Sequence, residues 1–289
     1  MDEFKKNLKE STGFRVFLYL VALLVCTLVG AGLTLLFSKS GDIQSLKIGQ
    51  GVGSVMMFVL PPIILYAFTR KNPMRELGFR KPLSAWFLLV GVVLMFVSLP
   101  VTNWLTDWNE KMQFGSFLEK LETLLKEMED AAGDLTERML QVDTLPGLLF
   151  NLLIIALIPA IGEELTFRGV LQQALVKRFK NPHGAILVSA AVFSFIHFQF
   201  YGFLPRMFLG LILGYLFYYS ESLWTSILMH FINNGTAVVI AYLEYKGLTE
   251  IAMEDFGSTS DVWLILASFV FTVGLVILCN KINHYYGRK

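Results

Sequence analysis

The composition of this 289-residue chain excludes an ordinary soluble domain, because 55% of its residues are hydrophobic and only 16% are charged. Its mean hydropathy is +0.58, and several apolar runs approach or exceed the roughly 20 residues that a helix needs to cross a bilayer. The formal net charge of +1 argues against a nucleic-acid partner and leaves membrane lipid as an expected one. Cys26 and Cys279 lie in apolar runs near opposite ends of the chain and are interpreted as packing residues rather than a disulfide.

Eight membrane-spanning helices are predicted, which makes the expected fold an all-α polytopic membrane bundle. The predicted ranges are 14–37, 51–69, 83–105, 146–162, 183–200, 203–219, 223–243 and 262–281. Prolines inside these ranges are expected to kink the helices, which neighbouring helices accommodate in a membrane; they are Pro61, Pro62, Pro100 and Pro159. We expect one integral-membrane domain over 1–289.

The distribution of basic residues predicts the orientation. With the N-terminus in the cytoplasm and eight crossings, 16 of the 24 Lys and Arg residues fall on the cytoplasmic side and 8 on the other side, as the positive-inside tendency requires. The first span is too long for a signal-peptide core, so we expect an uncleaved anchor behind the basic residues Lys5, Lys6, Lys9 and Arg15. The expected location is a bacterial plasma membrane, with both termini cytoplasmic.

The segment 107–145 is predicted to be an extramembrane insertion. Its acidic residues occupy one helix face, and apolar residues recur at helical spacing on the other; the apolar positions are Phe114, Phe117, Leu118, Leu121, Leu124, Leu125 and Met128. This pattern predicts an acidic amphipathic helix or helix pair. Two interpretations stay open, a cap that packs on the outside of the bundle and a lid or substrate-access element over an active site.

Charged residues inside apolar spans are costly and indicate function. The stretch IGEELTFRGVLQ at 161–172 contains three of them, Glu163, Glu164 and Arg168. Glu164 precedes Arg168 by four residues, which is the spacing of an ion pair along one helix face, and such a pair removes much of the cost of burying either charge. Glu163 is rotated by about 100° from Glu164 and lacks that partner, so Glu163 is the candidate general base.

Two histidines in other predicted spans complete a candidate site. His197 follows Phe193 by one helical turn in VFSFIHF, and His230 precedes Asn234 by one turn in SILMHFINN. An imidazole and an amide at this spacing can donate hydrogen bonds to a developing oxyanion, and His197 could share a water with Glu163. A lone histidine in a bundle more often bonds a neighbouring helix, but several such groups in one chain favour a site for hydrolysis by activated water.

A zinc site is the alternative use of the same side chains. Glu163, His197 and His230 could supply three ligands, with water in the fourth position. The sequence contains no H-E-x-x-H motif, so nothing else in it supports a metal. No cofactor is required by the pattern, and a divalent metal such as zinc stays open.

In chain order, the motifs E-E-x-x-x-R, F-x-x-x-H and H-x-x-x-N resemble those of the CPBP family, the CAAX protease and bacteriocin-processing (Abi) intramembrane endopeptidases. The motifs occupy residues 163–234, and the resemblance extends over about 146–243, the expected catalytic core. It implies an eight-helix membrane protease whose water is activated by Glu163 and His197. It also implies that His230 and Asn234 stabilise the tetrahedral intermediate, with support from Glu164, Arg168 and Phe193.

The resemblance implies a membrane-bound substrate without identifying it. Prenylated CAAX proteins are substrates of the eukaryotic branch of the family, and membrane-bound or bacteriocin-related peptides are the other expected class, reached from the bilayer or the cytoplasmic side. Because the role of metal in the family is disputed, no metal follows from the resemblance. A non-catalytic membrane protein, either transporter-like or a bacteriocin-immunity scaffold, is the alternative function.

Overall fold

The computed structural model describes residues 12–113, 115, 117 and 119–286, and the regular elements in this part of the chain are all helices. The predicted all-α fold is therefore confirmed. The α-helices are α2 (Thr12–Ser38), α3 (Ile43–Ser54), α4 (Leu60–Thr69), α5 (Pro73–Leu77), α6 (Ala85–Val97), α7 (Leu99–Glu110), α8 (Glu119–Leu140), α9 (Leu145–Asn151), α10 (Ile158–Glu164), α11 (Gln173–Phe179), α12 (Pro182–Phe195), α13 (Phe203–Ser220), α14 (Leu223–Tyr245) and α15 (Val262–Tyr286). Three π-helical segments continue some of them, namely η1 (Val55–Val59), η3 (Leu152–Leu157) and η4 (Leu165–Gln172). Lys5, Lys6, Lys9, Phe114 and Leu118, which the sequence analysis used, lie outside the described residues.

The described helices include six that are long and apolar enough to cross a membrane, which is the property of an integral membrane protein. They are Gly13–Ser38, Ile43–Thr69, Leu145–Phe179, Phe203–Ser220, Leu223–Tyr245 and Val262–His284. A seventh span results if α6 and α7, bent by 42°, are counted as one. The predicted span 183–200 is observed as α12, which has only 14 residues. Its length of about 21 Å is less than the roughly 30 Å of a hydrocarbon core, so α12 is too short to cross the membrane by itself. The predicted count of about eight spans is not confirmed.

The prolines change the helices in two ways. At Pro100 the chain bends between α6 and α7, as predicted. Before Pro62 and Pro159 the helix instead widens into η1 and η3, because proline lacks an N–H and its ring clashes with the carbonyl four residues earlier. The carbonyl of Phe58, to which Pro62 cannot donate, accepts a hydrogen bond from Thr166 Oγ1 at 2.9 Å. This bond ties η1 to η4, the segment that follows the acidic pair.

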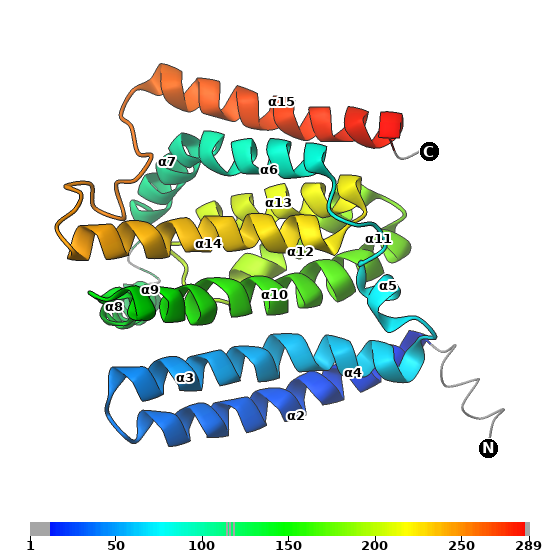
Figure 1. Ribbon diagram of the computed structural model, residues 1–289, viewed down its shortest axis with the longest axis horizontal. Coiled ribbons are helices and arrows are strands. Elements are labelled where there is room, and N and C mark those ends of the chain that lie inside the picture. The colour runs from blue at the N-terminus through cyan, green and yellow to red at the C-terminus, as the bar shows by residue number, and fades with distance from the viewer. Residues whose placement is uncertain (1–11, 114, 116, 118, 287–289) are drawn as a thin grey trace.

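Different helices meet at the two ends of the bundle (Figure 1). The start of α2 and the end of α15 lie at one end, together with α5 and α11, whereas α7, α8 and α9 lie at the other (Figure 1). In this view α8 is seen nearly end-on, so it crosses the direction of the other helices. The C-terminal end of α8 is anchored by buried Asn151, whose Nδ2 donates to the carbonyls of Met139 at 3.0 Å and Leu140 at 3.3 Å.

The apolar stripe predicted for 107–145 is largely exposed. Leu121, Leu124 and Met128 on α8 are 43%, 51% and 41% exposed, and burial is concentrated at the helix end in Met139 and Leu140. A cap would bury the stripe against the bundle, so the packing expected of a cap is found only at the end of α8. The first residues of the segment belong to α7, which continues to Glu110.

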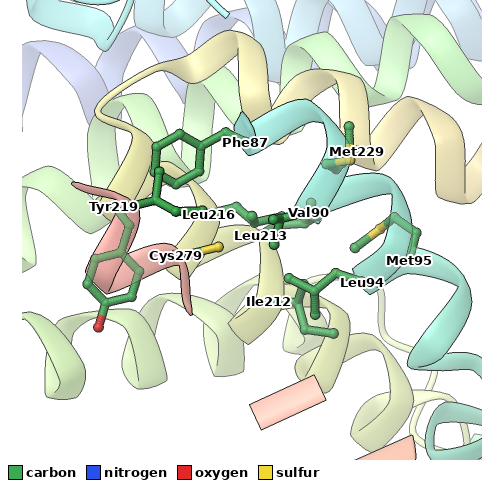
Figure 2. Packing of buried hydrophobic residues seen from close by; sticks show 11 residues of the cluster. Phe87, Val90, Leu94, Met95, Ile212, Leu213, Leu216, Tyr219, Met229 and Cys279 are labelled. Carbon is green, nitrogen blue, oxygen red and sulfur yellow. The ribbon is translucent and has the colours of Figure 1, made fainter. Parts of the chain in front are cut away.

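The main apolar core packs α6 and α15 against α13 and α14, and the last two helices also line the candidate site. Figure 2 shows this cluster, to which α6, α13, α14 and α15 all contribute. Its buried members are Phe87, Val90, Leu94, Met95, Ile212, Leu213, Leu216, Tyr219, Met229, Cys279 and Ile282. Cys279 is 1% exposed and Cys26 is 7% exposed, and neither forms a disulfide, so the prediction that both are packing residues is confirmed.

Candidate active site

The four predicted catalytic side chains line one cavity of about 370 Å³. Glu163 comes from the end of α10, His197 from the turn after α12, and His230 and Asn234 from α14. The remaining wall comes from α7, the end of α12 and the first half of α13, and includes Leu99, Thr102, Thr106, Phe193, Gly202, Pro205, Arg206 and Leu209. Segments that are far apart in the sequence therefore meet at one site, in the half of the bundle that carries α7 and α8 (Figure 1).

A buried chain of hydrogen bonds fixes His230. Arg168 Nη1 donates to Glu164 Oε1 at 2.7 Å, and the same oxygen lies 2.9 Å from His230 Nδ1. Glu164 is 0% exposed, Arg168 1% and His230 2%. Because an ionised carboxylate only accepts hydrogen bonds, Nδ1 of His230 carries a proton and Nε2 is left to face the cavity. The predicted Glu164–Arg168 pair is present, and it has the further task of orienting His230.

Glu163 points away from that pair, as its position on the helix predicts. Its Oε2 lies 3.8 Å from His230 Nε2, which is too long for a direct hydrogen bond. Glu163 also lines a second cavity of about 400 Å³ between η1, η3 and α10, where Met57, Phe58 and Ile154 provide an apolar wall. The candidate base therefore lies between a polar cavity and a more apolar one.

His197 and Asn234 each have a polar nitrogen that can hydrogen-bond to a molecule in the cavity. His197 Nδ1 lies 2.8 Å from the carbonyl of Phe193 and donates to it, so Nε2 is the ring nitrogen that can accept from a water molecule. Asn234 Oδ1 accepts from Asn233 Nδ2 at 3.2 Å, which leaves the Asn234 amide as a donor. The Phe193 ring packs edge-on against both His197 and His230 and lies under the Arg168 guanidinium.

The turn that carries His197 is held by two helices. Asn109 on α7 is 1% exposed, donates to the Phe200 carbonyl at 3.0 Å and accepts from the Leu204 N–H at 2.7 Å. On α8, the Glu129 carboxylate accepts from the Tyr201 N–H at 3.1 Å. Burial raises the pKa of the Glu129 carboxyl. The helix predicted to be a cap or a lid thus contacts the loop that carries the candidate catalytic residue His197.

Arg206 is a cavity residue that the sequence analysis did not single out. It is the one Lys or Arg side chain in the described lining of the cavity. Its signal was present in the sequence, because a lone arginine in FLPRMFLGL interrupts an otherwise apolar run. The contribution of α7, by contrast, had no signal in the sequence, since Leu99, Thr102 and Thr106 belong to no motif.

The candidate zinc ligands do not form a ligand set. Among the residues that the structure describes, no group of three His, Cys, Asp or Glu side chains is placed to hold one ion. Glu163, His197 and His230 share the cavity but do not converge on a common point within it. We therefore derive no step through a metal.

These features define a polytopic helical membrane protein with a partly buried cavity lined by Glu, His and Asn side chains. Residues 145–236, which contain all three motifs, match the family model "Rce1-like: Type II CAAX prenyl endopeptidase Rce1-like". The match covers about a third of the chain, supports the resemblance to the CPBP or CAAX protease family, and is consistent with a membrane protease. No curated protein matches the chain, and no solved structure does.

Proposed function

We propose that this protein is an intramembrane endopeptidase that hydrolyses a peptide bond with activated water. The observation that carries the proposal is the meeting of Glu163, His197, His230 and Asn234 around one cavity. These side chains come from three separate helical segments. Burying so many polar groups in a membrane bundle costs free energy, and such groups therefore indicate a functional site.

In the proposed reaction Glu163 accepts a proton from a water molecule that His197 Nε2 orients. The water oxygen then attacks the carbonyl carbon of the scissile peptide. Asn234 Nδ2 donates to the resulting oxyanion, and His230 Nε2 donates as well when its ring is doubly protonated. Glu164 Oε1, which lies 2.9 Å from His230 Nδ1 in the structure, accepts a hydrogen bond from the ring. Glu163 returns its proton to the leaving amine.

The substrate we propose is a membrane-bound peptide with an apolar anchor. Glu163 lies between two cavities, and the one walled by Met57, Phe58 and Ile154 suits a hydrocarbon chain, which can be a prenyl-like lipid or an apolar peptide segment. The polar cavity then takes the peptide on the other side of the scissile bond. Bacteriocin-related peptides belong to the same substrate class.

We further propose that both termini are cytoplasmic. Lys177 and Arg178 belong to α11, Arg70 directly follows α4, and Arg80 lies shortly after α5. Because α5 and α11 lie at the same end of the bundle (Figure 1), the positive-inside tendency assigns this end to the cytoplasm. The candidate cavity lies in the opposite half of the bundle. If the termini are cytoplasmic, the substrate does not reach this cavity from the cytoplasm, which was one of the two routes expected from the sequence. Access from the bilayer or the outer face follows.

Labelling of whole cells tests this orientation. Lys120→Cys on α8 and Arg178→Cys on α11 place single thiols at the two ends, against two native cysteines that are buried. A membrane-impermeant maleimide is expected to label Lys120→Cys in intact cells and Arg178→Cys only after permeabilisation. The reverse pattern contradicts the proposed orientation and leaves the hydrolytic proposal standing.

Turnover of a quenched prenyl-peptide by the purified protein in detergent tests the hydrolysis. Glu163→Gln and His197→Ala are expected to lose at least about 100-fold in kcat while abundance and melting temperature persist. The matched controls are Glu221→Gln and His183→Ala, which change residues outside the candidate cavity and are expected to keep full turnover. Equal turnover in all four variants contradicts the assigned site, and no turnover by the unaltered protein against a membrane-peptide library favours a non-catalytic transporter-like or scaffolding role.

A further inference from the structure

We propose that Arg206 binds a carboxylate of the substrate's leaving peptide, and so makes the enzyme select substrates with an anionic group just beyond the scissile bond. This inference rests on the proposed function and assigns a substrate-recognition residue to the same site. Arg206 stands near the start of α13 and lines the cavity that also contains Glu163, His197 and His230. The motifs found in the sequence do not include it.

Among the described residues, the guanidinium of Arg206 has no ion-pair partner. Its hydrogen bonds are to one residue, the carbonyl of Gln199 at 3.3 Å from Nη1 and Gln199 Oε1 at 3.0 Å from Nη2. No carboxylate of the described residues lies within 4.0 Å of it. Glu129 and Glu163 act on it only through longer-range attraction. A partly buried cation with donor positions left over is suited to an arriving anion.

The position of the guanidinium depends on Gly202. A Cβ built on Gly202 would lie 2.6 Å from Arg206 Nη2 and 3.3 Å from Cζ. The backbone of Gly202 has φ −100°, which any residue adopts, so the close approach of Arg206 is the obstacle to a side chain there. Gly202→Ala therefore displaces the guanidinium while leaving its charge in the protein.

The anionic group of an unmodified peptide that can bind the Arg206 guanidinium is a carboxylate. Arginine presents a planar fork of donors that matches a carboxylate in bidentate geometry, and Gln199 holds the fork from one side. The substrate carboxylate has two sources, the free C-terminus of a short leaving peptide and an acidic side chain within that peptide. Both supply the same chemistry to Arg206, and the peptides used in the test separate them.

The test compares three quenched peptides that are identical up to the scissile bond. One ends in a free carboxylate, one ends in an amide, and the third ends in an amide but has aspartate as its last residue. The unaltered protein is expected to cleave at least one of the two carboxylate peptides with a kcat/KM about 10- to 100-fold above that of the plain amide. Preference for the first identifies the C-terminus as the source, and preference for the third identifies the side chain.

Two variants and a control decide the role of Arg206. Arg206→Gln and Gly202→Ala are expected to bring the ratio of carboxylate to amide cleavage close to one, chiefly through KM of the carboxylate peptide. Lys246→Gln removes an exposed cation at the C-terminal end of α14 and is expected to keep the ratio. The inference fails if the unaltered protein shows no preference, or if Arg206→Gln slows all three peptides equally, which is the result of a purely electrostatic effect on Glu163.

A binding measurement separates this inference from the proposed function. Glu163→Gln retains the cavity without the proposed base, so the binding of the three peptides to it is measured without cleavage. Tighter binding of a carboxylate peptide by about 10-fold, lost in the Glu163→Gln, Arg206→Gln double variant, supports the role of Arg206 even if the unaltered protein turns nothing over. Equal binding of all three peptides overturns it.

Discussion

Removal of Arg168 tests the central electrostatic feature of the structure. In Arg168→Met the Glu164 carboxylate, which is 0% exposed, keeps only the His230 contact at 2.9 Å among its described partners. A buried charge left without its partner costs about 3–5 kcal/mol, and we expect the free energy of unfolding to fall by that amount. Adding Glu164→Gln removes the charge but keeps an oxygen that can accept from His230, so the double variant is expected to recover at least about 2 kcal/mol of this loss.

Equilibrium unfolding in mixed micelles measures both changes, and the chain contains a matched control. Lys126 and Glu122 on α8 form an ion pair at 2.8 Å with the same spacing of four residues, but on the surface. Lys126→Met is expected to change the free energy of unfolding by no more than the error of the measurement, because exposed pairs are screened by water. The reasoning is refuted if Arg168→Met resembles Lys126→Met, or if the double variant is as unstable as the single one.

Three further predictions concern the support of the site. Asn109→Ala removes the bonds to Phe200 and Leu204 and is expected to lower kcat about 10-fold or more by releasing the His197 turn, with a smaller effect on melting temperature; an unchanged kcat contradicts this role. Burial raises the pKa of Glu129 above its ordinary 4.5. The folded chain therefore holds this proton more tightly than the unfolded chain, and it loses stability as pH rises from the ordinary value through the raised one. Thermal melts are expected to show Glu129→Gln as more stable than the unaltered protein at neutral pH and equally stable at pH ~4. Chelation by EDTA is expected to leave turnover unchanged, because no three-ligand group occurs in the described residues, and a loss that zinc restores would contradict this expectation.

Local features of the site were predictable from the sequence because they depend on helical periodicity. The spacing of Glu164 and Arg168 predicts their ion pair, and the 100° rotation of Glu163 predicts that it faces another way. The structure places both as expected. The bend at Pro100 follows from the missing N–H of proline in the same way.

Features that depend on tertiary contacts were not predictable. The bond from His230 Nδ1 to Glu164 joins residues 66 positions apart, and no periodicity within one helix reveals it. His197 was placed inside a span, but α12 ends at Phe195 and the histidine lies in a turn held by α7 and α8. The π turn before Pro62 also needs a neighbouring segment, since Thr166 donates to the Phe58 carbonyl that this proline leaves unbonded.

One face of α13 provides backbone acceptors for the polar side chains of the charged motif. Arg168 Nη2 donates to the carbonyl of Gly210 at 2.8 Å, and Gln172, four residues later, donates to the carbonyl of Gly214 at 2.9 Å. The matching steps of four residues bring two polar side chains opposite two backbone acceptors on one side of α13. A Cβ on Gly214 would lie 2.9 Å from Gln172 Oε1, so the close approach requires a residue without a side chain. Arg206 precedes Gly210 by four residues and therefore lies along this same side of α13. The helix face that accepts hydrogen bonds from Arg168 and Gln172 thus also carries Arg206, the residue to which we assign substrate recognition.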